Sequence, residues 1–240
     1  MSDAPALGPP TLEADCVVKR YGERLVLKSG SVRAIPGLVI GLLGRNGAGK
    51  STLLRIMAGS LAPDSGVVRV DGAGRLAVSL PWLADRGVFF LPDRDLLHPR
   101  VSVGMQLSWI GDRFHRTAAV RDVCELMGIT AVLASKPRQL SGGERRRAEV
   151  ACALIRAPRV LILDEPLRGI APLDAERILS ALRAFARAGG AVVLTGHELP
   201  LLLPAVDRVT WCTAGTTREF TSVAQAMGDF AFRRDFLPLR

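Results

Sequence analysis

The sequence is poor in aromatic residues and in lysine, and this restricts its partners. Aromatic residues make up 5% of the 240 residues, with Tyr21 as the single tyrosine, and nearly all of the formal charge of +9 comes from arginine. This charge is compatible with nucleic acid or an anionic membrane surface as a partner. Proteins that bind single-stranded nucleic acid stack bases on aromatic side chains, and no such set is evident here. We therefore expect no stable nucleic-acid partner.

Long apolar runs are also missing. No stretch approaches the roughly 20 apolar residues that a membrane span needs. The apolar segment LPLLLPAV, residues 199–206, is short and carries two prolines. The opening MSDAPALGPP has turn-forming residues and an early acid, so we expect a flexible terminus over residues 1–12 and no signal peptide. These features predict a cytoplasmic protein that needs a partner for any work at a membrane.

Cysteine is sparse and scattered. Cys16, Cys124, Cys152 and Cys212 form no CxxC pair and have no histidine nearby. A zinc site or a disulfide framework requires closer grouping. We expect four reduced, mostly buried thiols.

Buried strands alternate with helices along the chain. Apolar runs such as LVIGLLG (residues 38–44), GVFFLP (87–92) and AVVLTGH (191–197) read as buried strands. Helical periodicity dominates residues 93–137 and recurs in ERILSALRAFARAGG, residues 176–190. The pattern predicts an α/β fold with a mostly parallel sheet between helices, and a helical insertion.

The segment GRNGAGKST matches the phosphate-loop pattern GxxxxGK[ST] in full. It follows a buried strand and opens a helix, so its backbone N–H groups and the helix N-terminus can surround phosphates. Lys50 supplies a mobile charge to the phosphates, and the Ser51 hydroxyl is placed to ligate Mg²⁺. The predicted nucleotide-binding residues are Gly44, Arg45, Asn46, Gly47, Ala48, Gly49, Lys50, Ser51 and Thr52.

Two acids end the strand in LILDEP, residues 161–166. The carboxyl edge of an open α/β sheet is where ligands bind. Asp164 is therefore predicted to hold the metal, and Glu165 to polarise an attacking water.

The segment LSGGE, residues 140–144, lies between these two motifs, and this order resembles the ABC ATPase family. The resemblance extends from about Cys16 to about Arg218. It implies a P-loop NTPase core with an N-terminal antiparallel β part and an inserted helical subdomain. We expect one domain over residues 13–240, with its core at about 13–92 and 138–225, the helical subdomain at about 93–137 and a C-terminal tail at about 226–240.

The resemblance also assigns roles to single residues. Tyr21 stands where the family stacks an aromatic ring on adenine, and His197 stands where it has its switch histidine. The loop GIAPLD ends in Asp174, the expected D-loop acid. In this family the signature holds the γ-phosphate of nucleotide bound to a second copy; the residues implied here are Ser141, Gly142, Gly143 and Glu144. Arg145 to Arg147 follow on a helix, where we expect a partly solvated face, although three consecutive arginines on their own would suggest nucleic acid.

Two positions depart from the family pattern. One concerns the link between the nucleotide site and the helical insertion, and the other concerns the cargo. Asp93, in LPD, stands where the family has a glutamine that reaches the metal. Aspartate could ligate Mg²⁺ but would repel a developing γ-phosphate charge; a shift of register at the strand end is the alternative. The segment GIAPLD, with Pro172, resembles the corresponding loop in the ATPases of branched-chain amino-acid importers. The segment SGGERRRAEVACAL instead resembles the lipopolysaccharide-export ATPase. The two hints disagree, so cargo and direction stay open.

The leading interpretation is the ATP-hydrolysing subunit of an ABC transporter, with ATP and Mg²⁺ as cofactors. Its expected partners are a second copy or a homologous ATPase subunit, in a head-to-tail dimer, and separate transmembrane subunits. We expect it at the inner face of the cell membrane, docked through the helical subdomain. The alternatives are a soluble ABC ATPase serving another assembly and a slowly hydrolysing regulatory subunit.

The substitution Asp93→Gln is expected to raise ATP turnover, because it removes an anion that opposes charge developing on the γ-phosphate. Steady-state phosphate release by the wild type and the variant measures this. Unchanged or lower turnover in the variant would count against this interpretation of Asp93.

Overall fold

A ten-stranded mixed sheet forms the framework of the described chain, which comprises residue 9 and residues 11–236 of the computed structural model. The strand order is β5-β4-β1-β2-β10-β9-β3-β8-β7-β6. The strands are β1 (Leu12–Tyr21), β2 (Arg24–Ala34), β3 (Val39–Leu43), β4 (Ser65–Val70), β5 (Ala73–Arg75), β6 (Val88–Leu91), β7 (Val160–Leu163), β8 (Ala191–Gly196), β9 (Arg208–Thr213) and β10 (Thr216–Phe220).

The two halves of the sheet differ in strand direction. The N-terminal strands pair antiparallel, β1 with β2 and β4, and β4 with β5. The strands β3, β6, β7, β8 and β9 are joined by parallel pairs. Every residue of β3, β7 and β8 is buried, as expected for strands covered on both faces. The predicted fold class, including its antiparallel N-terminal part, is confirmed.

The parallel register brings three motifs to one edge of the sheet. Leu43, the last residue of β3, pairs with Gly196 of β8, and Leu163 of β7 pairs with Leu194 of β8. The segments that follow these three strands therefore emerge side by side at their carboxyl ends, where α/β proteins bind ligands.

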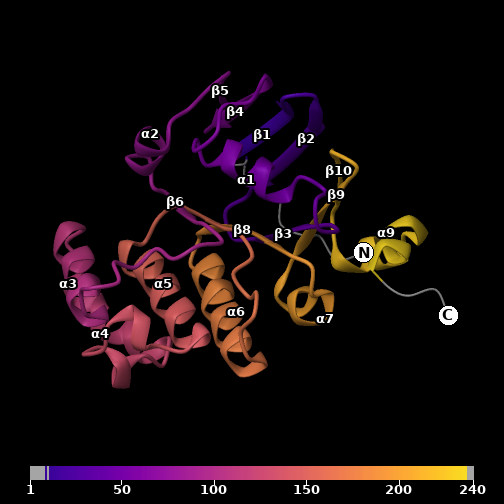
Figure 1. Ribbon diagram of the computed structural model, residues 1–240. Coiled ribbons are helices and arrows are strands. Elements are labelled where there is room, and N and C mark those ends of the chain that lie inside the picture. Colours follow the sequence, from indigo (N-terminus) through magenta and orange to yellow (C-terminus); the bar gives the residue numbers. More distant parts are fainter. Residues whose placement is uncertain (1–8, 10, 237–240) are drawn as a thin grey trace.

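Helices cover the sheet and build a separate group at one side (Figure 1). The helices are α1 (Lys50–Met57), α2 (Leu80–Ala84), α3 (Val103–Arg113), α4 (Thr117–Leu126), η1 (Thr130–Val132), η2 (Pro137–Gln139), α5 (Gly142–Arg156), α6 (Pro172–Arg187), α7 (Leu199–Leu202), η3 (Leu203–Ala205), α8 (Val223–Gly228) and α9 (Phe230–Phe236). Helix α5 packs against both α3 and α4, which ties the helical group to the core.

Both ends of the described part of the chain pack on the fold. Residues 1–8, 10 and 237–240 lie outside the described residues, but Thr11 and Leu12 are buried and Leu12 already pairs with Ala34. At the other end, Phe232 is fully buried against the rings of Trp211 and Phe220. Helix α9 therefore packs on the core as a cap.

Within residue 9 and residues 11–236, no helix combines the length and the apolar character needed to cross a membrane.

Candidate functional site

The phosphate loop wraps around the side chain of Lys50. Gly49 adopts φ +110°, and a Cβ on it would meet Leu27 Cδ2 at 2.8 Å, so both the backbone conformation and the space require glycine. Lys50 is 5% exposed, and its Nζ donates to the carbonyl of Gly44 at 2.8 Å and to that of Arg45 at 3.3 Å. The loop thus holds a preorganised cation at the N-terminus of α1, which favours a bound anion.

Asp164 joins the start of α1 to two strands. Its Oδ1 accepts hydrogen bonds from the hydroxyls of Ser51 and Thr195, both at 2.9 Å. Its Oδ2 is buried and has no hydrogen-bond partner among the described residues. A buried carboxylate oxygen without a partner is costly unless a ligand satisfies it. The hydroxyl and carboxylate oxygens are the donor type that Mg²⁺ prefers, so this pair fits the metal that the sequence predicts.

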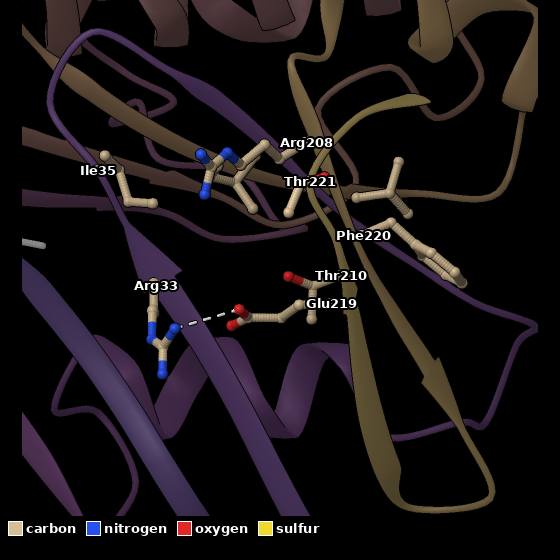
Figure 2. Close-up of a pocket in the computed structure, with 9 residues that line it drawn as sticks. Arg33, Ile35, Arg208, Thr210, Glu219, Phe220 and Thr221 are labelled. Atoms are coloured by element: carbon tan, nitrogen blue, oxygen red, sulfur yellow. Dashed lines mark hydrogen bonds and ion pairs between the residues drawn. The ribbon is translucent and has the colours of Figure 1, made fainter. Parts of the chain in front are cut away.

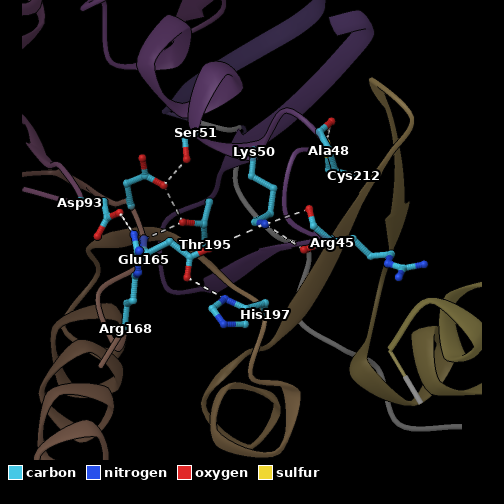
Figure 3. Close-up of polar contacts among 12 residues, drawn as sticks. Arg45, Ala48, Lys50, Ser51, Asp93, Glu165, Arg168, Thr195, His197 and Cys212 are labelled. Carbon is cyan, nitrogen blue, oxygen red and sulfur yellow. Dashed lines mark hydrogen bonds and ion pairs between the residues drawn. The ribbon is translucent and has the colours of Figure 1, made fainter. Parts of the chain in front are cut away.

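Glu165 is held in position from three sides. Its φ of +47° is unusual for a residue other than glycine, and its backbone N–H donates to Thr195 Oγ1 at 2.7 Å. The side chain lies 3.0 Å from His197 Nδ1 through Oε2 and 3.7 Å from Lys50 Nζ through Oε1. Glu165 and His197 therefore meet beside the phosphate-loop lysine, as Figure 3 shows.

One open cleft of about 870 Å³ joins these residues. Tyr21, which is 46% exposed, lines it together with Glu165 and His197. The cleft-lining residues are Tyr21, Arg24, Val26, Asn46, Gly47, Gly49, Lys50, Ser51, Thr52, Arg55, Asp93, Glu165, Arg168, Gly169, His197 and Glu198. A much smaller cavity beside the Arg33–Glu219 ion pair shares no residue with it (Figure 2).

Asp93 lies in this cleft, paired with a cation that sequence reasoning did not single out. Its Oδ2 accepts from Arg168 Nη1 at 2.7 Å. Arg168 follows Glu165 by three residues, and its backbone N–H donates to the Glu165 carbonyl at 3.2 Å. Because of this turn, Arg168 lines the same cleft as Glu165.

The signature begins α5 with a capping box. Ser141 Oγ accepts from the Glu144 N–H at 3.2 Å, while the Ser141 N–H and hydroxyl both donate to Glu144 Oε2 at 2.8 Å. The Ser141 N–H bond, with that from the hydroxyl, holds the pKa of Glu144 below its usual range. Ser141 and Gly142 are exposed and do not line the cleft of Lys50. They are available to another molecule.

Gly143 and Asp174 lie against each other. A Cβ on Gly143 would meet Asp174 Oδ2 at 1.9 Å, so any larger residue would have to displace the Asp174 carboxylate. Asp174 stands in the first turn of α6 and pairs with Arg147 Nε at 2.9 Å. The structure thus places the expected D-loop acid beside the signature and away from the residues that line the Lys50 cleft.

The expectation that Arg145 to Arg147 form a partly solvated face is wrong for two of the three. Arg146 and Arg147 are 9% and 8% exposed. Arg146 donates to the carbonyls of Pro92, Asp164 and Pro166 and pairs with Glu149 Oε2 at 3.0 Å. Free backbone carbonyls at the ends of β6 and β7 provide these acceptors, which explains the burial. Both arginines act within the fold.

The sequence offered weak signals for the residues that were missed. Thr195 is a polar residue within the apolar run AVVLTGH, two positions before His197. Cys212 donates through Sγ to the Ala48 carbonyl at 3.1 Å beneath the phosphate loop, and burial raises the pKa of its thiol to about 11. Arg168 carried no such signal, because an arginine in a loop usually points into solvent.

Comparison with known proteins assigns these motifs a family. A family model described as ABC transporter matches residues 27–168, which is more than half of the chain. The chain is 38% identical over 208 residues to the molybdenum import ATP-binding protein ModC of Mycobacterium tuberculosis, covering 80% of this chain and 55% of that protein. It is 31% identical over 231 residues to the lipopolysaccharide export ATP-binding protein LptB of Acidithiobacillus ferridurans, covering 94% and 96%.

A further relative and two solved structures extend the comparison. The Nod factor export ATP-binding protein I of Rhizobium etli is 36% identical, covering 80% of this chain and 62% of its own, so the chain spans little more than half of ModC and this exporter. An ADP-bound ATP-binding cassette of an ABC transporter superposes with a TM-score of 0.84 at 21% identity, covering 97% of this chain and 100% of the other. A dimeric bacterial ABC transporter cassette superposes with a TM-score of 0.78 at 22% identity, covering 88% and 98%.

The substitution Arg146→Met is expected to lower the free energy of unfolding by about 3 kcal/mol, because it leaves the buried Glu149 without its cation. Arg145→Met is the matched control, since Arg145 is more exposed and its ion pair within the described residues is with the exposed Asp95; we expect a change within about 0.5 kcal/mol. Urea denaturation measures both. Equal effects of the two substitutions would contradict the role assigned to Arg146.

Proposed function

This chain belongs to the ABC transporter ATP-binding family, and on that premise we propose that it binds and hydrolyses ATP as the energy-supplying subunit of a transporter. The observation that carries the proposal is the convergence of Lys50, Ser51, Asp164, Glu165 and His197 at one sheet edge. The family generally hydrolyses ATP. Lys50, Ser51, Glu165 and His197 line this cleft, and the buried Asp164 accepts a hydrogen bond from Ser51.

The geometry supports a separate role in hydrolysis for each of these side chains. Lys50 and the N–H groups at the start of α1 bind the phosphates. Ser51 and Asp164 would hold Mg²⁺, which would supply charge neutralisation to the phosphates. Glu165 accepts a hydrogen bond from the attacking water and orients it. His197, which contacts Glu165 at 3.0 Å, fixes that carboxylate and donates toward the γ-phosphate.

A second nucleotide-binding chain completes the proposed site. The exposed Ser141 hydroxyl and Gly142 N–H are anion donors at a helix N-terminus. They lie outside the cleft of their own chain, which favours a role toward nucleotide held by the opposite copy. The Ser141 hydroxyl now donates to Glu144, so it must turn away from that carboxylate to reach a phosphate. The solved dimeric cassettes support such pairing.

The proposed membrane partner docks on the helical group. Met105 and Trp109 are one helical turn apart on α3, and both are more than half exposed. The named relatives serve transporters, some for import and some for export. The proposal therefore extends to peripheral attachment at the membrane and to the transporter class, with no cargo assigned.

Phosphate release from ATP with Mg²⁺ tests the hydrolytic part. We expect turnover by the wild type and a loss of at least about 100-fold in Glu165→Gln, because the water loses the anion that polarises it. Lys50→Ala should abolish turnover by weakening nucleotide binding, whereas Glu165→Gln should still bind ATP. Full turnover in Glu165→Gln would refute the role of Glu165.

A further inference from the structure

The Asp93–Arg168 ion pair lies inside the nucleotide cleft, on the same wall as the reactive acids. Both side chains line the cavity that also contains Gly47, Lys50 and Glu165. Figure 3 shows Arg168 beside Glu165, with its guanidinium directed at Asp93. A ligand whose phosphates extend from Lys50 toward Glu165 would approach this pair.

The Asp93–Arg168 ion pair is weak enough for Arg168 to leave Asp93 and bind another anion. The Arg168 side chain is 65% exposed and that of Asp93 is 32% exposed, and exposed ion pairs contribute about 0–1 kcal/mol. Arg168 meets Asp93 through Nη1 alone, whereas a guanidinium has five N–H donors in a fork that matches a phosphate group. A terminal phosphate with more than one negative charge is a stronger partner than a single carboxylate.

Local charge explains why the two residues occur together. Glu165 and Glu198 already place carboxylates around the cleft. An unpaired Asp93 would add another anion facing the phosphates, and Arg168 neutralises it. Asp93 in turn holds a long, flexible side chain near the place where the phosphate arrives.

We propose that Arg168 is a nucleotide-binding residue, held by Asp93 in the nucleotide-free protein and transferred to the terminal phosphate when ATP binds. The inference rests on the proposed function of the cleft. It assigns Asp93 the role of a competitor for Arg168, in addition to any contact with a metal. An arginine in this role discriminates ATP from ADP, because ADP lacks the terminal phosphate that the arginine binds.

The competing explanation is that the pair only fastens the loop after β6. The same loop has a second ion pair, Arg145 Nε with Asp95 Oδ1 at 3.4 Å, which does not line the nucleotide cleft. The two explanations predict different effects of Arg168→Gln and Asp93→Asn on the affinity for ATP. Loss of either half of a tether would have the same effect, whereas the exchange predicts opposite effects.

The test measures the dissociation constants of ATP and ADP for the full chain without Mg²⁺, so that metal binding by Asp93 does not contribute. Arg168→Gln should weaken ATP binding about tenfold, as expected for one charge-assisted contact, and ADP binding much less. Asp93→Asn should tighten ATP binding by several-fold, because it removes both the competitor and an anion. Arg168→Lys should fall between Arg168→Gln and the wild type, because lysine keeps the charge and loses the fork.

Arg145→Gln and Asp95→Asn are the matched controls and should leave both dissociation constants unchanged. Thermal unfolding of every variant shows whether the folded state is kept. Changes of the same sign in Arg168→Gln and Asp93→Asn, or equal effects on ATP and ADP, would overturn this inference and leave the proposed function intact. A wild type that binds neither nucleotide would overturn the proposed function, and the inference with it.

Discussion

The buried carboxylate of Asp164 connects the elements from which the site is built. Asp164 directly follows β7, accepts hydrogen bonds from Ser51 on α1 and from Thr195 on β8, and is 1% exposed. Thr195 in turn accepts the Glu165 N–H and so fixes the backbone that aims Glu165. An anion at this depth is stable only with donors or a cation around it. The phosphate loop and two strand ends therefore keep one relative position around this group.

Arg146 extends the same arrangement to the helical group. It lies on α5, just after the signature, and donates to the Asp164 carbonyl, the Pro166 carbonyl and the Pro92 carbonyl. Glu149, its ion-pair partner, accepts the N–H of Leu96. One buried pair thus joins the signature helix, the strand that carries the acids and the loop that carries Asp93. Helix α5 in turn packs against α3 and α4.

Much of the fold and the motif part of the site could be predicted because their signals are local. Apolar runs that end in glycine or paired acids mark the buried strands, and the phosphate loop has a fixed spacing whose backbone requirements only glycine meets. Parallel pairing then brings together the ends of β3, β7 and β8, which are followed by the phosphate loop, Asp164 and His197. Each of these inferences needs only a local sequence pattern and the rule that the carboxyl ends of parallel strands meet at one edge of a sheet.

The residues that escaped prediction depend on contacts between distant segments. Arg146 and Arg147 look like surface charge until the free carbonyls of other elements are placed around them. Arg168 and Asp93 are 75 residues apart, and no local pattern pairs them. Thr11 is buried because its N–H donates to the carbonyl of Ala34 on the neighbouring strand, a partner that lies 23 positions away in the sequence. In each case the burial or pairing of the residue depends on a partner that is distant in the sequence.

The central claim is that the signature of one copy and the phosphate loop of another enclose the same nucleotide. Light scattering on Glu165→Gln protein, with and without ATP, tests it most directly, because the variant retains nucleotide that the wild type would consume. We expect a monomer without ATP and a dimer with it, and a monomer in both conditions when Ser141→Arg is added to block the signature. A variant that binds ATP yet stays monomeric would contradict the claim for a pair of identical chains.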